Sequence, residues 1–263
     1  MRIVTWNINS VRLRLASLER LMAEAAPDVV CLQETKTVDD AFPRGRIAEL
    51  GYPHMAIRGM KGYNGVAILS RLPIEPLGGR NFCGRDDSRH IAARIDGRLD
   101  LHCLYVPAGG DEPDPEVNEK FAHKLGFLDE MAEWGGELRR GGRPAMAVGD
   151  FNVAPLETDV WSHKQLLRIV SHTPIEVEKF TRAQTAGGWV DTTRHFIPPA
   201  EKLYSWWSYR ARDWDEADRG RRLDHVWATP DLVPALSGAS ILRPVRGWEQ
   251  PSDHVPVIVD LGG

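Results

Sequence analysis

Short apolar segments, far apart in the chain, each border an acidic or amide side chain. Segments 3–6, 29–32, 145–148 and 255–259 have the length and apolar content typical of buried β-strands. The bordering polar residues are Asn7, Glu34, Asp150, Asn152, Asp253 and His254, and Asp224 opens a further strand at 223–228. Residues in loops at strand ends often carry function. The pattern therefore predicts a fold in which several strand ends meet at one edge.

The stretch Pro251–Pro256 places an acid–histidine pair at the mouth of the last strand. Adjacent strand residues point to opposite faces, so Asp253 and His254 serve separate roles only where the backbone bends. The two flanking prolines favour such a bend. Taken alone, the stretch is equally compatible with a surface turn that the histidine caps.

The composition is that of an ordinary globular protein: 263 residues, 42% hydrophobic, 27% charged, with a formal net charge of -4. We expect a single domain over 1–263. Three cysteines with no zinc spacing favour reduced thiols over a disulfide framework. The chain starts directly with a strand pattern and has no membrane-length apolar run. We expect a cytoplasmic monomer that does not bind a membrane.

Strand and helix patterns alternate early in the chain, and short strands then dominate each half. Ser10 is expected to cap a helix over 11–26, further helical patterns cover 39–50 and 116–138, and 158–188 is helical or irregular. The end of the first strand is echoed at Gly149–Asn152. An α/β sandwich of two packed sheets with helices outside accounts for this order.

Carboxylate and amide oxygens are hard ligands, so the polar set suits Mg²⁺, with Mn²⁺ able to substitute, better than zinc. One histidine beside these acids predicts acid–base or oxyanion work near neutral pH. Each residue also has a simpler interpretation. Asn7 and Asp150 are compatible with turns, and Glu34 with a solvated side chain. Their joint occurrence at strand ends favours a site.

A stretch over 203–222 interleaves aromatic and basic side chains. In one interpretation the arginines bind phosphates while Trp206 and Leu223 line a binding pocket. In the other, the tryptophans are core and the arginines pair with nearby acids. Arginine and acidic residues are balanced locally, so the sequence leaves both open.

Six motifs, in the same order as in a known family, span nearly the whole chain. They are Trp6–Asn9, Leu32–Lys36, Gly62–Ala67, Gly149–Asn152, Arg222–Asp224 and Ser252–Pro256. They resemble the exonuclease III class of apurinic/apyrimidinic (AP) endonucleases, in the endonuclease/exonuclease/phosphatase superfamily. The resemblance implies a four-layered α/β sandwich of two packed mixed β-sheets flanked by helices. It also implies Mg²⁺-dependent incision of double-stranded DNA 5′ to abasic sites, 3′-5′ exonuclease action and cleaning of blocked 3′ ends.

The resemblance further implies individual roles. Tyr105, Asp150, Asn152, Asp224 and His254 correspond to catalytic positions. The metal positions are Asn7, Glu34, Asp150, Asn152, Asp253 and His254. DNA contacts fall to Arg89, Trp206, Arg221 and Leu223, although Arg221 stands where some members carry an apolar or aromatic residue, and a structural salt bridge explains Arg89 equally well.

Two rival functions remain open at this point. The first is another phosphoesterase of the superfamily, acting on RNA or a phospholipid headgroup, which would share the metal site. The second is a catalytically inactive DNA-binding member. Buried unpaired acids are costly to keep without a metal or substrate, which argues against the second.

Overall fold

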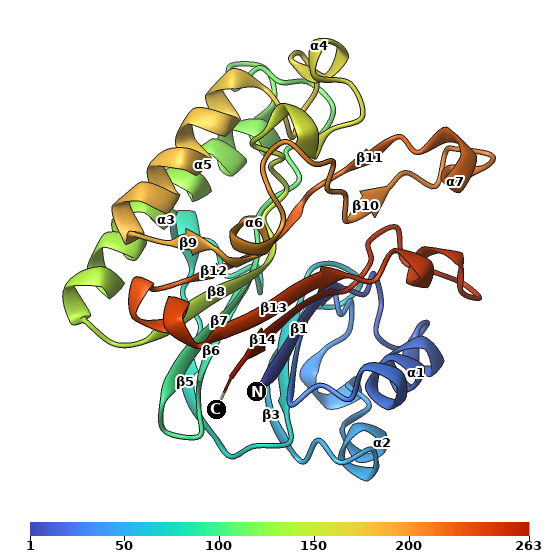
Figure 1. The fold of residues 1–263 in the computed structure, drawn as a ribbon, viewed down its shortest axis with the longest axis vertical. Coiled ribbons are helices and arrows are strands. Elements are labelled where there is room, and N and C mark those ends of the chain that lie inside the picture. Colours follow the sequence, from blue (N-terminus) through green and yellow to red (C-terminus); the bar gives the residue numbers. More distant parts are fainter. Residues whose placement is uncertain (263) are drawn as a thin grey trace.

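A computed structural model describes residues 1–262. Two six-stranded sheets pack face to face at its centre (Figure 1). The first sheet comprises, in spatial order, β13 (Leu236–Ile241), β14 (Val257–Leu261), β1 (Arg2–Asn7), β2 (Val29–Gln33), β4 (Val66–Ser70) and β3 (His54–Arg58). The second comprises β5 (Ile74–Gly78), β6 (His90–Ile95), β7 (Leu99–Tyr105), β8 (Ala145–Asp150), β12 (Asp224–Ala228) and β9 (Val190–Asp191). The expected pair of mixed sheets is confirmed.

Helices cover the outer face of each sheet. Helices α1 (Leu15–Ala25) and α2 (Arg44–Glu49) lie on the first sheet, and α3 (Glu119–Gly141) and α5 (Pro174–Gly187) on the second (Figure 1). The shorter elements are α4 (His163–Leu166), α6 (Thr192–Phe196), α7 (Trp214–Ala217), the pair β10 (Trp206–Trp207) and β11 (Gly220–Arg221), and the 3-10 turns η1 (Asp39–Ala41), η2 (Phe82–Gly84), η3 (Glu157–Asp159), η4 (Pro230–Ala235) and η5 (Arg243–Gly247). The order helix, sheet, sheet, helix gives the expected four layers.

Three apolar core clusters, one between each pair of adjacent layers, hold the sandwich together. Ile3 and Val29 point between the sheets, whereas Val4 and Val30 point toward α1. Because both faces of β1 and β2 are covered, these strands are apolar throughout rather than alternating. The outer face of the second sheet packs on α3 and α5 through aromatic side chains such as Phe127.

The two central strands have matching neighbours, which gives the echo between the halves a structural meaning. β1 pairs parallel with β2 and antiparallel with β14, and β8 pairs parallel with β7 and antiparallel with β12. Parallel neighbours end at the same edge of a sheet. Asn7 and Asp150, the last residues of β1 and β8, therefore close their strands on the same side of the molecule.

The first helix departs from its expected start. Ser10 does not cap it; α1 begins at Leu15 with Arg14 as N-cap, after turns over 11–14. The backbone N–H groups of Ser10 and Val11 instead donate to the carbonyls of Glu34 and Thr35. The segment after β1 is therefore held against the segment after β2, which delays the helix by about one turn.

Candidate active site

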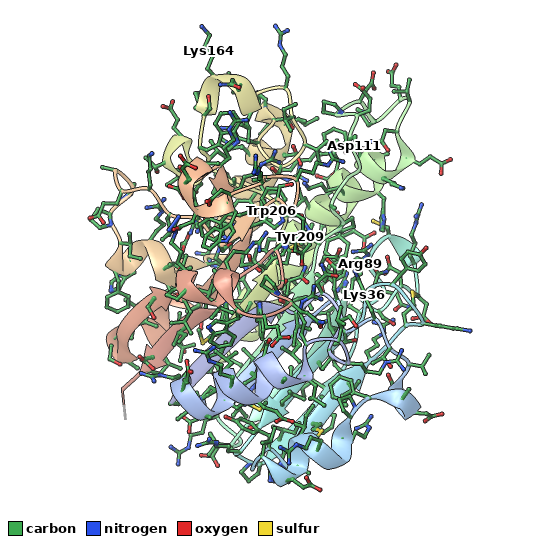
Figure 2. The ribbon with its side chains drawn as sticks, turned by 90° about the vertical axis from the view of Figure 1, so that its right-hand side faces the viewer. Lys36, Arg89, Asp111, Lys164, Trp206 and Tyr209 are labelled. Carbon is green, nitrogen blue, oxygen red and sulfur yellow. The ribbon has the colours of Figure 1, made fainter. Side chains whose placement is uncertain are left out.

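Several strand ends converge on an open cleft of about 880 Å³. Glu34, Asp150 and His254 all line it. Asn7 closes β1 beside Glu34, and Asp224 opens β12 opposite Asp150 in the antiparallel register. Figure 2 shows the face that carries Lys36, Arg89, Trp206 and Tyr209. The expectation that these strand ends meet at one edge of the molecule is thus confirmed.

Asn7 connects the acids of the two sheets. Its carboxamide nitrogen donates to Glu34 Oε1 and to Asp150 Oδ2, each at 2.9 Å. The Tyr105 hydroxyl donates to the same Glu34 oxygen at 2.9 Å. Glu34 itself has a positive φ of 50°, an uncommon backbone conformation that turns the chain sharply after β2. Four residues predicted from sequence therefore lie in mutual contact.

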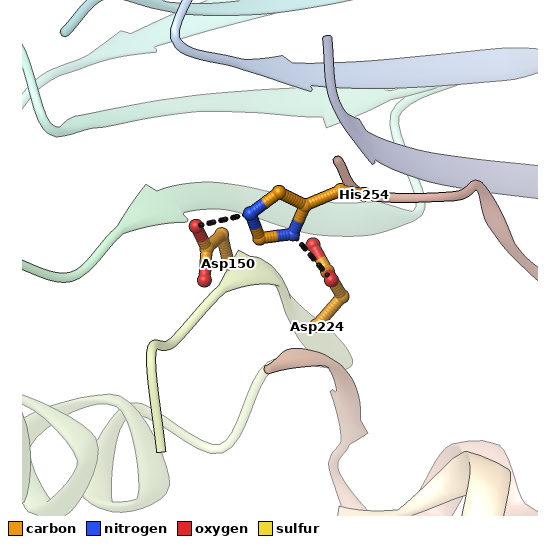
Figure 3. A group of neighbouring side chains, drawn as sticks. All are labelled: Asp150, Asp224 and His254. Atoms are coloured by element: carbon orange, nitrogen blue, oxygen red, sulfur yellow. Dashed lines mark hydrogen bonds and ion pairs between the residues drawn. The ribbon is translucent and has the colours of Figure 1, made fainter. Parts of the chain in front are cut away.

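His254 lies between two buried carboxylates (Figure 3). Its Nδ1 donates to Asp224 Oδ2 at 2.8 Å, and its Nε2 lies 3.6 Å from Asp150 Oδ2. The Ser205 hydroxyl donates to Asp224 Oδ2 at 2.7 Å. Burial alone would lower the pKa of His254, but the charges of Asp224 and Asp150 outweigh it and raise that pKa to about 10. The imidazole is therefore a cation at neutral pH.

Asp150 has a pKa close to neutrality. Burial is the main cause, and the charge of Asp224 adds to it, while the positive charge of His254 works in the opposite direction; together they raise the pKa of Asp150 to about 7. Glu34 behaves differently, because its hydrogen bond and ion pair with Lys36 outweigh burial and keep its pKa below the usual value. Two acids of one site thus have separated proton affinities, as acid–base sites require.

The loop after β8 holds Asn152 in a left-handed conformation, with φ of 53°. Its backbone N–H donates to Asp150 Oδ1 at 3.0 Å, and its carboxamide nitrogen donates to the Val106 carbonyl at 2.9 Å. Asn152 lines the cleft beside Asp150. Gly149 allows this turn, because a Cβ there would lie 1.9 Å from the Leu104 carbonyl oxygen.

Asp253 faces the cleft but points away from Asp150. Its Oδ1 accepts from Asn9 at 3.2 Å, and its Oδ2 accepts from the Trp206 indole at 2.9 Å. Burial would raise the pKa of Asp253, but the charge of His254 and these hydrogen bonds keep it low. The bend expected between Asp253 and His254 is therefore present, and the two neighbours contact different partners.

The aromatic–basic stretch combines both interpretations. Trp206 and Leu223 line the cleft, and the guanidinium of Arg221 lies 5.2 Å from the Trp206 ring centroid. Trp207 is almost fully buried and packs against the rings of Tyr204 and Trp214, and Arg222 is buried in ion pairs with Asp159 and Asp191.

Arg89 is held at the rim of the cleft. Its guanidinium donates to Asp87 at 2.6 Å and lies 4.7 Å from the Tyr105 ring centroid. A structural salt bridge is thus present, and the guanidinium also remains beside the tyrosine of the site.

Two residues of the site were missed at the sequence level. Ser205 supports Asp224, and Asn9 joins Asp253 to Lys36, whose ammonium donates to Asn9 Oδ1 at 2.6 Å. Asn9 follows Asn7 by two residues, and this spacing was available as a signal. Ser205 gave none, because a serine before a tryptophan is compatible with any surface strand.

The donor chemistry fits a hard divalent cation. Ligand atoms of Asp150, Asp224 and His254 lie within 4.8 Å of one another, and the carboxylate of Glu34 is joined to Asp150 through Asn7. The positive charge on His254 makes the imidazole a poor ligand and favours the oxygen atoms instead. Among the residues that line the cleft, the acids Glu34, Asp150 and Asp253 gather beside His254, and arginines such as Arg219 and Arg221 line another part of its wall.

Comparison with known proteins agrees with this architecture. A family model described as the endonuclease/exonuclease/phosphatase family matches residues 4–254. The chain belongs to this family. It is 31% identical to exodeoxyribonuclease III of Haemophilus influenzae, over 98% of each chain. Its fold matches an AP endonuclease from Archaeoglobus fulgidus with a TM-score of 0.92, 32% identity and 99% coverage of both chains.

A family relative has been solved with nucleic acid. A 3′ phosphatase from Neisseria bound to a product DNA hairpin matches with a TM-score of 0.90 and 28% identity, over 100% of both chains. No helix among residues 1–262 is long and apolar enough to cross a membrane. The chain is thus related over its whole length to DNA repair nucleases.

Proposed function

We propose that this protein is a Mg²⁺-dependent DNA repair phosphodiesterase. It incises double-stranded DNA 5′ to abasic sites, removes blocking groups from 3′ ends, and degrades DNA in the 3′-5′ direction, as a monomer in base excision repair. The observation that carries the proposal is that His254 is fixed between Asp150 and Asp224 in a cleft that Glu34 and Asn152 also line. The full-length likeness to AP endonucleases supports it.

Glu34 is the proposed main metal ligand. Asn7 and Asp150 adjoin it directly, and Asn152 and Asp253 are further metal candidates around the cleft, whereas His254 uses its two nitrogens for Asp224 and the phosphate. A bound Mg²⁺ or Mn²⁺ supplies charge neutralisation at the phosphate and the leaving 3′ oxygen. Lys36 pairs with Glu34 at 2.8 Å and holds this carboxylate ionised and oriented.

The protein groups supply the proton transfer and orientation. Asp150 accepts the proton of the attacking water on its carboxylate, for which a pKa near neutrality is suited. Asn152 orients this water or the phosphate. His254 donates from Nε2 to a phosphate oxygen, and Asp224 fixes the ring through Nδ1. Tyr105 donates to another phosphate oxygen from its hydroxyl.

The walls of the cleft bind the DNA. Trp206 and Leu223 provide an apolar surface for a flipped-out sugar that has lost its base. Arg221 and Arg89 lie at this surface and at the rim, where guanidinium groups contact phosphates.

A duplex with one labelled abasic analogue tests the proposal directly. With Mg²⁺ the expected product ends immediately 5′ to the analogue; Mn²⁺ supports the same cut, and a chelator abolishes it. Parallel reactions contain a 3′-phosphate duplex, a single-stranded RNA and a phospholipid headgroup. Cleavage of only the RNA or the headgroup would replace the proposal by a different phosphoesterase, and no cleavage of any phosphodiester would indicate an inactive DNA-binding protein.

A further inference from the structure

A lysine and a glutamate form a fully buried ion pair behind the catalytic loop. Lys124 belongs to α3 and Glu176 to α5, and both side chains have 0% exposure. Isolated buried charges cost several kcal/mol each, and even paired ones are often no more stabilising than apolar residues of the same volume. Stability alone is therefore a weak reason for this pair.

Lys124 holds the catalytic loop from behind. Its ammonium donates to the carbonyl oxygen of Asn152 at 2.7 Å and to that of Ala108 at 3.3 Å. Asn152 has the positive φ of the loop after β8, and Ala108, in the segment after the neighbouring strand β7, also lines the cleft. One buried cation thus fixes two cleft segments that come from different strands.

Glu176 holds a third segment. Both of its carboxylate oxygens accept the backbone N–H of Ser171 at 2.9 Å, and one also accepts from the backbone and the hydroxyl of Thr173. The Ser171 hydroxyl in turn accepts a hydrogen bond from Arg221 at 2.8 Å. A continuous set of contacts therefore runs from Asn152 to the wall that carries Arg221.

We propose that Lys124 and Glu176 are positioning residues, which set the catalytic loop and the pocket wall in register with each other. The proposal rests on the proposed function of the cleft. Neither residue reaches the cleft itself, so both act through Asn152, Ala108 and Ser171. A misplacement of about 1 Å at a reacting group costs roughly 100-fold in rate, so a tie of this kind affects turnover strongly.

The surrounding backbone is built to admit the lysine. Gly109 has a φ of +93°, and a Cβ at this position would lie 2.9 Å from the Lys124 Cδ and 3.0 Å from Val170. Only glycine fits between the stem of the lysine and the pocket wall without displacing one of them. This close approach places the ammonium under the loop rather than beside it.

The test variant is Lys124→Met with Glu176→Gln, which removes both charges and keeps an acceptor for Ser171 and Thr173. We expect kcat on the abasic duplex to fall about 10- to 100-fold, with KM changed less than 3-fold. Hydrogen exchange of the segment 150–154 should rise. This second measurement does not require activity, so it also tests the proposal on a protein that cleaves nothing.

The same two helices offer a matched control. Lys179 of α5 pairs with Asp129 of α3 at 2.7 Å, but this pair is partly exposed and contacts no cleft segment. Lys179→Met with Asp129→Asn should leave kcat and the exchange of 150–154 unchanged. An equal loss of kcat in the control would show that any α3–α5 ion pair matters, and would overturn the positioning role.

Coupling to Asn152 gives the decisive comparison. In an Asn152→Ala background the double substitution should cost clearly less than in the wild type, because one of the groups that it positions is already gone. The same 10- to 100-fold loss in both backgrounds would overturn the proposal, as would unchanged kcat and exchange. If the double variant does not fold, Lys124→Met alone serves, because Glu176 keeps its hydrogen bonds from Ser171 and Thr173, and a fall in kcat and raised exchange are again expected. Wild-type inactivity on every DNA substrate would refute the proposed function but leave the exchange test intact.

Discussion

Two buried charged clusters, one at the cleft and one behind it, are built from similar residues but differ in balance. The cleft cluster (Glu34, Asp150, Asp224, His254) has three acids around one imidazole, with Lys36 at its edge. The arginine–aspartate cluster (Asp159, Asp191, Arg194, Arg222) pairs two acids with two guanidinium groups.

The difference in charge balance indicates that the cleft cluster serves function and that the arginine–aspartate cluster serves folding. In the arginine–aspartate cluster each charge is compensated, and Asp159 joins η3, α6 and the strand β11 region through Arg194 and Arg222. In the cleft cluster burial, together with the charge of Asp224, raises the pKa of Asp150, so the folded protein holds a carboxylate whose ionised form a bound cation would stabilise. The same substitution, aspartate to asparagine, should therefore have opposite consequences in the two clusters.

The largest expected effect is that of Asp150→Asn in the cleft. The amide cannot take a proton from water, so kcat should fall about 10³- to 10⁴-fold. The free energy of unfolding without metal should stay the same or rise, because one of three crowded acids is removed. Steady-state cleavage and urea unfolding measure the two quantities; near-normal kcat would remove Asp150 from the mechanism.

Asp159→Asn is the reciprocal change in the arginine–aspartate cluster. It leaves two buried guanidinium groups without their shared acid, so unfolding should cost about 3 kcal/mol less. Activity of the protein that remains folded should change only a few-fold at low temperature. A loss of kcat as large as that of Asp150→Asn, without loss of stability, would erase the distinction between the clusters.

Mg²⁺ should stabilise the protein through the cleft cluster alone. At a concentration of 100 times Kd, one site adds about 2.7 kcal/mol to the free energy of unfolding. Asp159→Asn should keep this increment, whereas Glu34→Gln should lose most of it. Thermal unfolding with Mg²⁺ and with chelator provides the comparison, and an increment that survives Glu34→Gln would place the metal elsewhere.

The smallest expected effect concerns pH, and here His254 of the cleft cluster contrasts with two buried histidines outside both clusters. Burial lowers the pKa of His225 to about 3 and that of His102 to about 4, so both are neutral when folded. Histidine in the unfolded chain takes up a proton near pH 6.5. The contribution of these two neutral histidines to the free energy of unfolding is therefore lost as pH falls from 6.5 toward these values. His254, with its raised pKa of about 10, contributes stability below pH 6.5 and loses it as pH rises toward 10.

Each neutral core histidine should therefore cost about 1 kcal/mol of stability between pH 6 and pH 5. His225→Gln keeps a donor for the Val153 carbonyl, which His225 Nε2 contacts at 2.7 Å. Its stability should fall less steeply over this pH interval than that of the wild type, by about that amount. Urea unfolding at pH 6 and pH 5 measures the free energy of unfolding of both proteins. An equal fall in wild type and variant would show that His225 is not neutral in the core.

Strand patterns and motif order predicted much of the fold. The apolar runs that became β1, β2 and β8 were evident because both of their faces are buried. The strand β5 was missed, since it is a mostly exposed edge strand containing Pro76 and Gly78. The start of α1 was misplaced because its delay comes from backbone hydrogen bonds to Glu34 and Thr35, which are distant in sequence.

Residue types and their spacing were enough to predict which side chains have the chemistry for a metal-dependent hydrolase. They also predicted that these side chains lie at strand ends along one edge. Apolar periodicity and the residue types at strand ends are local properties, so they can be recognised in the amino-acid sequence alone. The pairing of His254 with Asp224 and Asp150 became known only from the fold, as did the hydrogen bond that Asp253 accepts from Trp206. The fold also showed that Arg222 is structural, and that Lys124 and Glu176 lie behind the loop. Partners across a fold, and the pKa values that they set, depend on distances between segments that are far apart in the chain.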